Sequence, residues 1–136
     1  MKENIKIAHM KSAFNYAELS YCVRKKVGSI IVKNDRVISI GYNGTKPGDL
    51  NVCEDENNNT LPNVIHAEKN AIKKIEDDLP LLKDSAIFVT MCPCLPCAEL
   101  ILKSGITEVY YAEEYRLNDG VEFLKINGIF VQRISV

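Results

Sequence analysis

Residues 86–105 read AIFVTMCPCLPCAELILKSG, a β-branched and aromatic run followed by a cysteine-rich turn and an amphipathic segment. The opening AIFVT favours a strand. The closing CAELILKSG predicts a helix that ends at Gly105, because glycine is typical of helix C-termini. A strand, a turn and a helix in this order predict one unit of an α/β fold, with cysteine side chains at the start of the helix.

Strands and helices are predicted on both sides of this unit. Apolar positions at helical spacing predict a helix over the first twenty or so residues. VGSIIV (27–32) and RVISIGY (36–42) predict a hairpin around Lys33-Asn34-Asp35. Further along, the pattern predicts a helix at 66–79, a strand at 108–113, a short helix at 120–128 and a last strand at 129–136. This order predicts a single three-layer α/β/α domain over residues 1–136, with a mixed five-stranded sheet whose later strands are parallel.

Residues 43–63 interrupt this alternation. The segment is rich in asparagine, glycine and proline and has no hydrophobic periodicity. Loops of this length without secondary structure are uncommon in compact domains and are often functional. We therefore expect this loop to have a functional role.

The composition restricts the partners of the chain. The formal net charge is −1 and 26 % of the residues are charged, which argues against a broad surface for a nucleic-acid polymer. No apolar run approaches the length of a membrane span, so no membrane partner is expected. The N-terminal segment lacks the apolar centre of a signal peptide, so we expect a cytoplasmic location. In that reducing compartment, metal binding or catalysis is a better explanation of five cysteines than disulfides.

Three side chains are candidate metal ligands. Cys94 and Cys97 have CxxC spacing at the start of a predicted helix, where the helix dipole favours the thiolate form. His66 starts the predicted helix 66–79, with Glu68 two residues on. Helices that follow parallel strands start at the same edge of a sheet, so these ligands can converge. Three protein ligands with a fourth position for water are typical of catalytic zinc.

This arrangement makes a geometric demand on the histidine. Residues two positions apart point to nearly opposite sides of a regular helix. His66 must therefore precede the regular part of its helix if it and Glu68 are to reach one site.

His66-Ala67-Glu68 followed by Pro93-Cys94-Leu95-Pro96-Cys97 matches the signature of zinc nucleobase deaminases, His-x-Glu and Pro-Cys-x-x-Cys. From about residue 27 to residue 130 the sequence resembles the deoxycytidylate (dCMP) deaminases of bacteria and phages. The segments that carry the resemblance, in the family's order, are VGSIIV, GYNG, IHAEKNAI, FVTMCPCLPCAELI, SGITEVYYAEEY and INGIFV. The resemblance implies a cytidine-deaminase-like fold.

The resemblance also implies a reaction, the zinc-dependent hydrolysis of dCMP to dUMP and ammonia, which supplies dUMP for thymidylate synthesis. His66, Cys94 and Cys97 would hold one zinc ion that activates water for attack on C4 of the cytosine ring. Glu68 would protonate N3 and then the departing amino group. The substrate contacts implied by similarity are Asn43 to the sugar, the Ala67 backbone to the pyrimidine, Tyr115 on the phosphate side, and Lys26 or Arg24 as added positive charge.

Assembly and regulation are implied in the same way. Family members often form homo-oligomers, commonly hexamers, that dCTP with Mg²⁺ activates and dTTP inhibits through the region after GYNG. Residues 43–56 are the candidate effector segment. Some phage relatives hold a second, structural zinc, for which Cys22 and Cys53 are candidates without a suitable histidine. Cys92 stands where serine is common, and we expect it to pack on its strand rather than to bind metal.

Two other classes of protein stay open from the residues. The first is another zinc deaminase, acting on free cytidine or on adenosine in tRNA, although the near-zero net charge disfavours a tRNA substrate. The second is a non-catalytic binding module stabilised by zinc. The presence of Glu68 and a set of three ligands disfavour that module.

Overall fold

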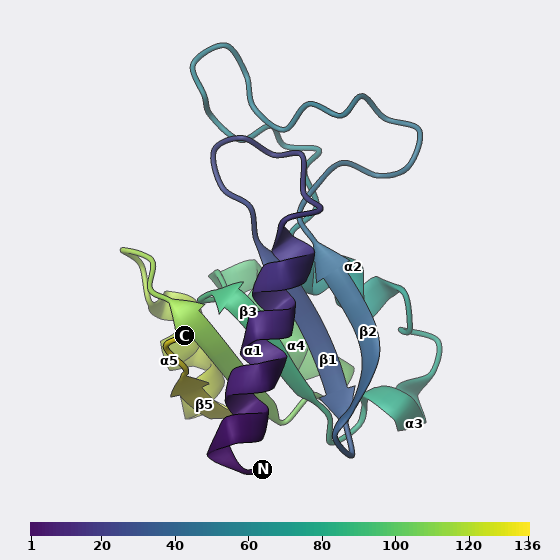
Figure 1. Ribbon diagram of the computed structural model, residues 1–136, viewed down its shortest axis with the longest axis vertical. Helices are drawn as coiled ribbons and strands as arrows, with labels where there is room; N and C mark the ends of the chain where they lie inside the picture. The colour runs from purple at the N-terminus through teal and green to yellow at the C-terminus, as the bar shows by residue number, and fades with distance from the viewer.

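The computed structural model describes all residues from Met1 to Val136. Its five strands form one sheet in the order β2-β1-β3-β4-β5 (Figure 1). The strands are β1 (Gly28–Lys33), β2 (Arg36–Tyr42), β3 (Ala86–Met91), β4 (Glu108–Glu113) and β5 (Phe130–Arg133). β1 is antiparallel to β2 and β3, whereas β4 is parallel to β3 and to β5. The predicted mixed sheet with parallel later strands is confirmed.

Helices cover both faces of the sheet. One face carries α1 (Glu3–Ala17), and the other carries α2 (Ala67–Lys73), α4 (Leu95–Ser104) and α5 (Asp119–Ile126) (Figure 1). Two separate clusters of buried apolar side chains fill the space between the sheet and these layers. Met10 and Ala13 belong to the cluster under α1, while Ile72 and Ile101 belong to the other. The predicted three-layer arrangement is confirmed.

The helix predicted over 66–79 is wrong at its C-terminal end. α2 stops at Lys73, and a separate short helix, α3, spans Leu79–Leu82. The Asp78 side chain accepts a hydrogen bond from the Leu81 backbone N–H and so caps α3. Pro80 follows in the first turn of α3, where a missing N–H costs little. The continuous polar and apolar pattern did not reveal this break.

Glycine and serine in the hairpin bring α2 directly onto the sheet. A Cβ atom added to Gly41 would lie 2.3 Å from the Ala67 carbonyl oxygen and 2.6 Å from the Ala71 nitrogen. The Ser29 hydroxyl donates a hydrogen bond of 2.8 Å to the Ala67 carbonyl, and the Ser39 hydroxyl donates one of 2.6 Å to the Ala71 carbonyl. These contacts from the β1–β2 hairpin therefore fix the distance of α2 from the sheet and its rotation about its own axis.

Replacement of Gly41 by alanine should destabilise the protein. The new methyl group overlaps the α2 backbone, and overpacking of this kind costs about 1–3 kcal/mol. We expect a fall in Tm of about 3–10 °C, measured by calorimetry. The control is Gly128→Asn, because a Cβ atom at Gly128 meets nothing within 4 Å and asparagine tolerates its φ of 82°. An unchanged Tm for Gly41→Ala would show that α2 is free to move away from β2.

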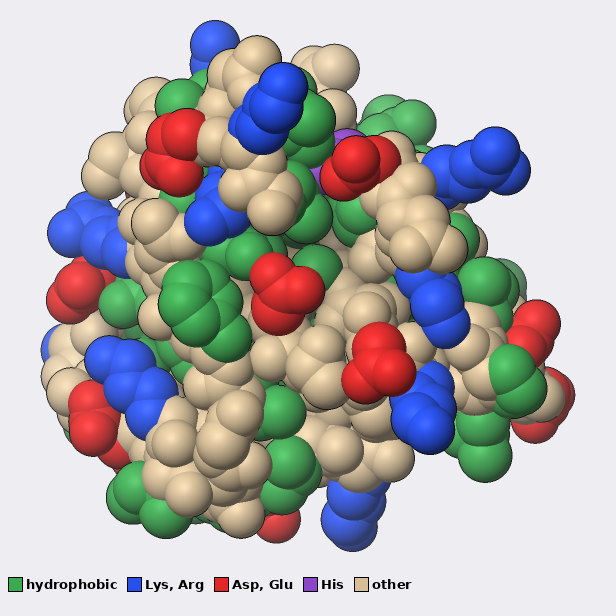
Figure 2. Space-filling view, turned by 90° about the horizontal axis from the view of Figure 1, so that it is seen from below, with side chains coloured by type: hydrophobic (Ala, Val, Ile, Leu, Met, Phe, Trp, Pro, Cys, Tyr) green, Lys and Arg blue, Asp and Glu red, His purple; other side chains and the backbone are tan.

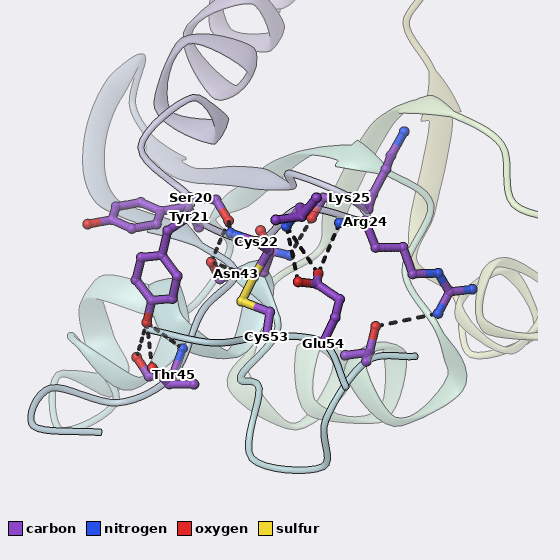
Figure 3. Close-up of a disulfide and its surroundings, with 12 residues drawn as sticks. Ser20, Tyr21, Cys22, Arg24, Lys25, Asn43, Thr45, Cys53 and Glu54 are labelled. Atoms are coloured by element: carbon purple, nitrogen blue, oxygen red, sulfur yellow. Dashed lines mark hydrogen bonds between the residues drawn. A yellow bond between two sulfur atoms is a disulfide. The ribbon is translucent and has the colours of Figure 1, made fainter. Parts of the chain in front are cut away.

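Cys22 and Cys53 form a disulfide in the structure (Figure 3). The expectation that the cysteines serve metal binding or catalysis rather than disulfides is therefore wrong for these two. Both sulfurs are used in the bond, so this pair offers no thiolate to a second zinc. The bond closes a separation of 31 residues between the α1–β1 connection and the loop after β2. The remaining cysteines, Cys92, Cys94 and Cys97, are free.

One face of the molecule has mixed charge. On the face seen from below in Figure 2, lysine and arginine side chains alternate with aspartate and glutamate, and no continuous basic stripe crosses it. No helix of the structure combines the length and the apolar character needed to cross a bilayer.

Candidate active site

The candidate site lies at one edge of the sheet. Because β1 is antiparallel to both its neighbours, the C-terminal ends of β2, β3 and β4 share this edge with the start of β1. α2 and α4 begin here, and the long loop after β2 and the α1–β1 connection extend from it at the top of Figure 1. Segments far apart in the sequence therefore meet at the positions predicted for chemistry.

The three predicted metal ligands come together. His66 Nδ1 lies 3.5 Å from Cys94 Sγ and 3.3 Å from Cys97 Sγ. Tetrahedral zinc, bound at about 2.0–2.1 Å from nitrogen and about 2.3 Å from sulfur, requires an N···S separation of about 3.6 Å. One imidazole and two thiols at these distances fit zinc, and a three-residue donor set leaves a fourth position open.

Two helix starts create this geometry. His66 is the N-cap of α2, with φ −69° and ψ 155°, and Cys94 is the N-cap of α4, with φ −72° and ψ 168°. Both residues are extended, so their side chains leave the regular helix. The predicted position of His66 outside the regular part of its helix is confirmed. Cys97 lies one turn into α4 and is 5 % exposed.

The electrostatics of the cluster favour ligation by sulfur. A hydrogen bond from Cys97 lowers the pKa of the Cys94 thiol, which favours the thiolate form of Cys94. Hydrogen bonding to this thiolate raises the pKa of Cys97, which keeps the proton of the pair. Hydrogen bonding to Cys94 also raises the pKa of His66. A divalent cation would displace the remaining protons.

Glu68 is a buried acid beside these ligands. Its side chain is in the first turn of α2 and only 4 % exposed. Burial raises the pKa of its carboxyl group to about 7. A carboxyl group with such a pKa can accept and return a proton near neutral pH.

A cavity of about 310 Å³ opens next to this cluster, within the size range of small-molecule sites. Its lining combines the cluster with residues from both loops. The predicted site residues among those that line it are Arg24, Asn43, His66, Ala67, Glu68, Cys94 and Tyr115.

The predicted substrate residues are already engaged with the protein in different ways. The Asn43 amide accepts a hydrogen bond from the Val27 N–H at 2.9 Å and donates one to the Lys25 carbonyl at 2.8 Å, so it also ties down the α1–β1 connection. Ala67 begins α2. Tyr115 is 43 % exposed, and its backbone N–H donates to Cys92 Sγ at 3.2 Å.

Arg24, Lys25 and Lys26 are three adjacent cations, and two of them lie at the cavity. Arg24 and Lys25 line it, and Lys26 is exposed and does not. Lys25 pairs with Glu113 at 3.1 Å, and Arg24 Nη1 donates to the Thr60 hydroxyl at 3.4 Å. Sequence reasoning missed Lys25 and Thr60, because adjacent cations in a loop give no sign of which one faces inward.

Two further residues shape the cysteine turn. A Cβ atom at Gly120 would lie 2.2 Å from the Pro93 carbonyl oxygen, so the start of α5 rests directly on this turn. Cys92 is 8 % exposed and lines the cavity, where burial raises its pKa. Its sulfur accepts the Tyr115 N–H and lies outside the group formed by His66, Cys94 and Cys97.

A His-Cys-Cys cluster with a buried glutamate, at the edge of an α/β sheet and open to a cavity, defines a zinc-dependent nucleobase deaminase site. Comparison with known proteins agrees. Residues 3–113 match the family model described as the cytidine and deoxycytidylate deaminase zinc-binding region. The chain belongs to this family.

Individual relatives extend the match over nearly the whole chain. The dCMP deaminase of cyanophage S-TIM5, crystallised with dCMP and dUMP, is 41 % identical and superposes with a TM-score of 0.94, covering 98 % of this chain and 99 % of that one. Deoxycytidylate deaminase of Saccharomyces cerevisiae is 35 % identical over 93 % of this chain, and ComE operon protein 2 of Bacillus subtilis is 34 % identical over 86 %. The chain spans only 43 % of the yeast protein and 64 % of the Bacillus protein.

Proposed function

We propose that this chain hydrolyses dCMP to dUMP and ammonia. The observation that carries the proposal is a cavity lined by Glu68, by His66 and Cys94 of the candidate metal ligands, and by the cations Arg24 and Lys25. The chain also superposes over 98 % of its length on a deaminase crystallised with dCMP and dUMP. A pyrimidine nucleoside monophosphate has a polar ring at one end and an anion at the other. The cavity offers complementary groups to both.

His66, Cys94 and Cys97 would hold the zinc ion. Bound zinc supplies a Lewis acid that lowers the pKa of water from about 15.7 to about 7. Two thiolates and one imidazole would leave the ion almost neutral, and His66 and Cys94 line the cavity. The chain thus provides the ligands and the access.

Glu68 would move the proton. Its carboxylate form would take a proton from the attacking water, and its acid form would deliver that proton to N3. It would then take the second proton, from the hydroxyl group left on C4, and deliver it to the departing amino group, which leaves as ammonia. Burial in the first turn of α2 keeps this carboxyl group in place, and its raised pKa lets both forms be reached at neutral pH. Ala67 would contact the pyrimidine through its backbone, and Asn43 the sugar.

Arg24 and Lys25 would bind the phosphate, with Tyr115 beside it. This replaces Lys26 with Lys25 in the set suggested by sequence, because Lys25 lines the cavity and Lys26 does not. Charged hydrogen bonds of this kind contribute about 1.5–3 kcal/mol each.

Turnover of different substrates tests the function. Zinc-loaded protein should release ammonia from dCMP and not from deoxycytidine or dCTP at comparable rates. Activity on free cytidine or a tRNA alone would place the chain among the other zinc deaminases. No turnover of any of these, together with unfolding on chelation, would favour the non-catalytic module.

Loss of the two inward-facing cations should weaken dCMP binding selectively. We expect Arg24→Ala/Lys25→Ala to raise the KM for dCMP by about 10–100-fold, with little change for deoxycytidine, in steady-state assays of ammonia release. Lys26→Ala is the matched control and should behave as the wild type. A stronger effect of Lys26→Ala than of the double variant would reverse the assignment.

Three expectations from the sequence stay predictions. These are the homo-oligomer, commonly a hexamer in the family, the regulation by Mg²⁺-dCTP and dTTP through residues 43–56, and the cytoplasmic location. Assays with and without dCTP, and light scattering for the mass of the assembly, test the first two.

A further inference from the structure

Two loops contribute residues to the cavity lining, and one covalent bond joins them. Cys22 lies in the α1–β1 connection, which also carries Arg24 and Lys25, and Cys53 lies in the loop after β2. Both cysteines are 2 % exposed, and their Cα atoms are 5.2 Å apart. Figure 3 shows the disulfide with Glu54 directly beside it, pointing toward the α1–β1 connection.

Glu54 binds the backbone of that connection. Its carboxylate accepts hydrogen bonds from the Val23 N–H at 3.1 and 3.2 Å and from the Arg24 N–H at 3.0 Å (Figure 3). Hydrogen bonds from backbone N–H groups to a carboxylate are about twice as strong as those between neutral groups. Glu54 forms no ion pair in the structure. Its contacts therefore serve the backbone that leads into Arg24.

The segment that Glu54 holds has little apolar packing. Val23 is 81 % exposed, and Arg24 is exposed as well. No helix or strand includes residues 18–27. Polar contacts therefore carry much of its support. Glu54 binds the backbone before Arg24, Asn43 binds the Lys25 carbonyl and the Val27 N–H, and the Arg24 and Lys25 side chains add contacts to Thr60 and Glu113.

We propose that Glu54 is a positioning residue for the phosphate of the substrate, and that the Cys22–Cys53 disulfide holds Glu54 against the α1–β1 connection. The proposal rests on the proposed function, because it takes the anion at Arg24 and Lys25 to be a nucleotide phosphate. His66, Glu68 and Cys94 lie at the starts of α2 and α4 and are supported by the hairpin and by α5. Loss of Glu54 or of the disulfide should therefore weaken phosphate binding and leave the chemical step unchanged.

Binding of the product dUMP measures the effect of Glu54 and the disulfide on affinity without turnover. We would compare the Kd of dUMP with that of deoxyuridine, which lacks the phosphate, by calorimetry on zinc-loaded protein. Glu54→Ala should weaken dUMP binding by about 10-fold and leave deoxyuridine unchanged. Glu54→Gln keeps one acceptor oxygen and should lie between Glu54→Ala and the wild type. Exposed Glu56, two residues on, provides the control Glu56→Gln, which removes the same charge without effect.

The disulfide is tested in the same assay. Cys22→Ser/Cys53→Ser should weaken dUMP binding in the same selective way. Reduction of the wild type by a phosphine, which is oxidised to the phosphine oxide by the oxygen of water while the S–S bond becomes two thiols, should reproduce this effect. The same reductant should not change the double variant. The KM for dCMP should rise in parallel at constant kcat.

The outcomes separate the two proposals. Equal losses for dUMP and deoxyuridine, or no loss in Glu54→Ala, would overturn the positioning role even if the protein deaminates dCMP efficiently. Absence of dCMP turnover by the wild type would refute the proposed function, and the dUMP comparison would still decide whether Glu54 positions a phosphate site.

Discussion

Replacement of Glu68 by glutamine should lower kcat for dCMP by about 10²- to 10⁴-fold, the usual contribution of a general acid and base. Glutamine has nearly the same shape, so it preserves the packing of this buried position at the start of α2. Its amide can neither accept a proton from water nor donate one to N3 or the departing amino group, so these proton transfers are lost. Zinc content, measured by mass spectrometry of metals, should stay that of the wild type.

The control for this prediction is Glu99→Gln on the exposed side of α4, which makes the same chemical change away from the cavity. It should leave kcat and zinc content unaltered. Full activity of Glu68→Gln would remove Glu68 from the reaction. Loss of zinc in Glu68→Gln would instead assign it to the metal site.

Replacement of Cys97 by alanine should abolish zinc binding and activity together. The cluster then keeps only His66 and Cys94, and two ligands do not make a stable zinc site. We expect a loss of zinc affinity greater than the roughly 10–100-fold caused by removing an outer hydrogen-bond partner of a ligand. Competition with a chromophoric chelator measures this affinity. Zinc should also no longer raise the Tm of the variant.

Cys92→Ser is the matched control for the sulfur chemistry. Cys92 is buried, and its sulfur accepts the Tyr115 N–H, a contact that a serine hydroxyl can also make. This variant should bind zinc as the wild type does and keep most of its activity. Zinc bound normally by Cys97→Ala but lost from Cys92→Ser would mean that the ligand set is wrong.

The sequence was most informative where local chemistry decides structure. β-branched runs predicted the strands, Gly105 predicted the end of α4, and its φ of 94° confirms why glycine is needed there. The convergence of His66 with Cys94 and Cys97 was predictable because parallel strands send their following helices from one edge. The extended N-cap conformation of His66 followed from the demand that it and Glu68 reach one point.

The sequence was least informative about the loops. The Cys22–Cys53 disulfide links residues 31 positions apart, a pairing that no spacing rule selects, and the lack of an export signal argued against it. The inward orientation of Lys25 rather than Lys26 depends on how Asn43 and Glu54 hold the backbone on either side. These are tertiary contacts between two segments without periodicity, so the pattern of either segment alone does not contain them.

The edge of the sheet that carries the site combines the starts of two helices with two loops that have no regular secondary structure. The groups proposed for bond breaking belong to the starts of α2 and α4, which the hairpin and α5 support. Arg24, Lys25 and Asn43, which are proposed to contact the phosphate and the sugar, belong to two crosslinked loops. Exchange of those loops for loops of other composition should redirect the enzyme to other cytosine compounds while sparing its catalytic machinery. Laboratory evolution of new specificities would accordingly concentrate its mutations in residues 18–27 and 43–65.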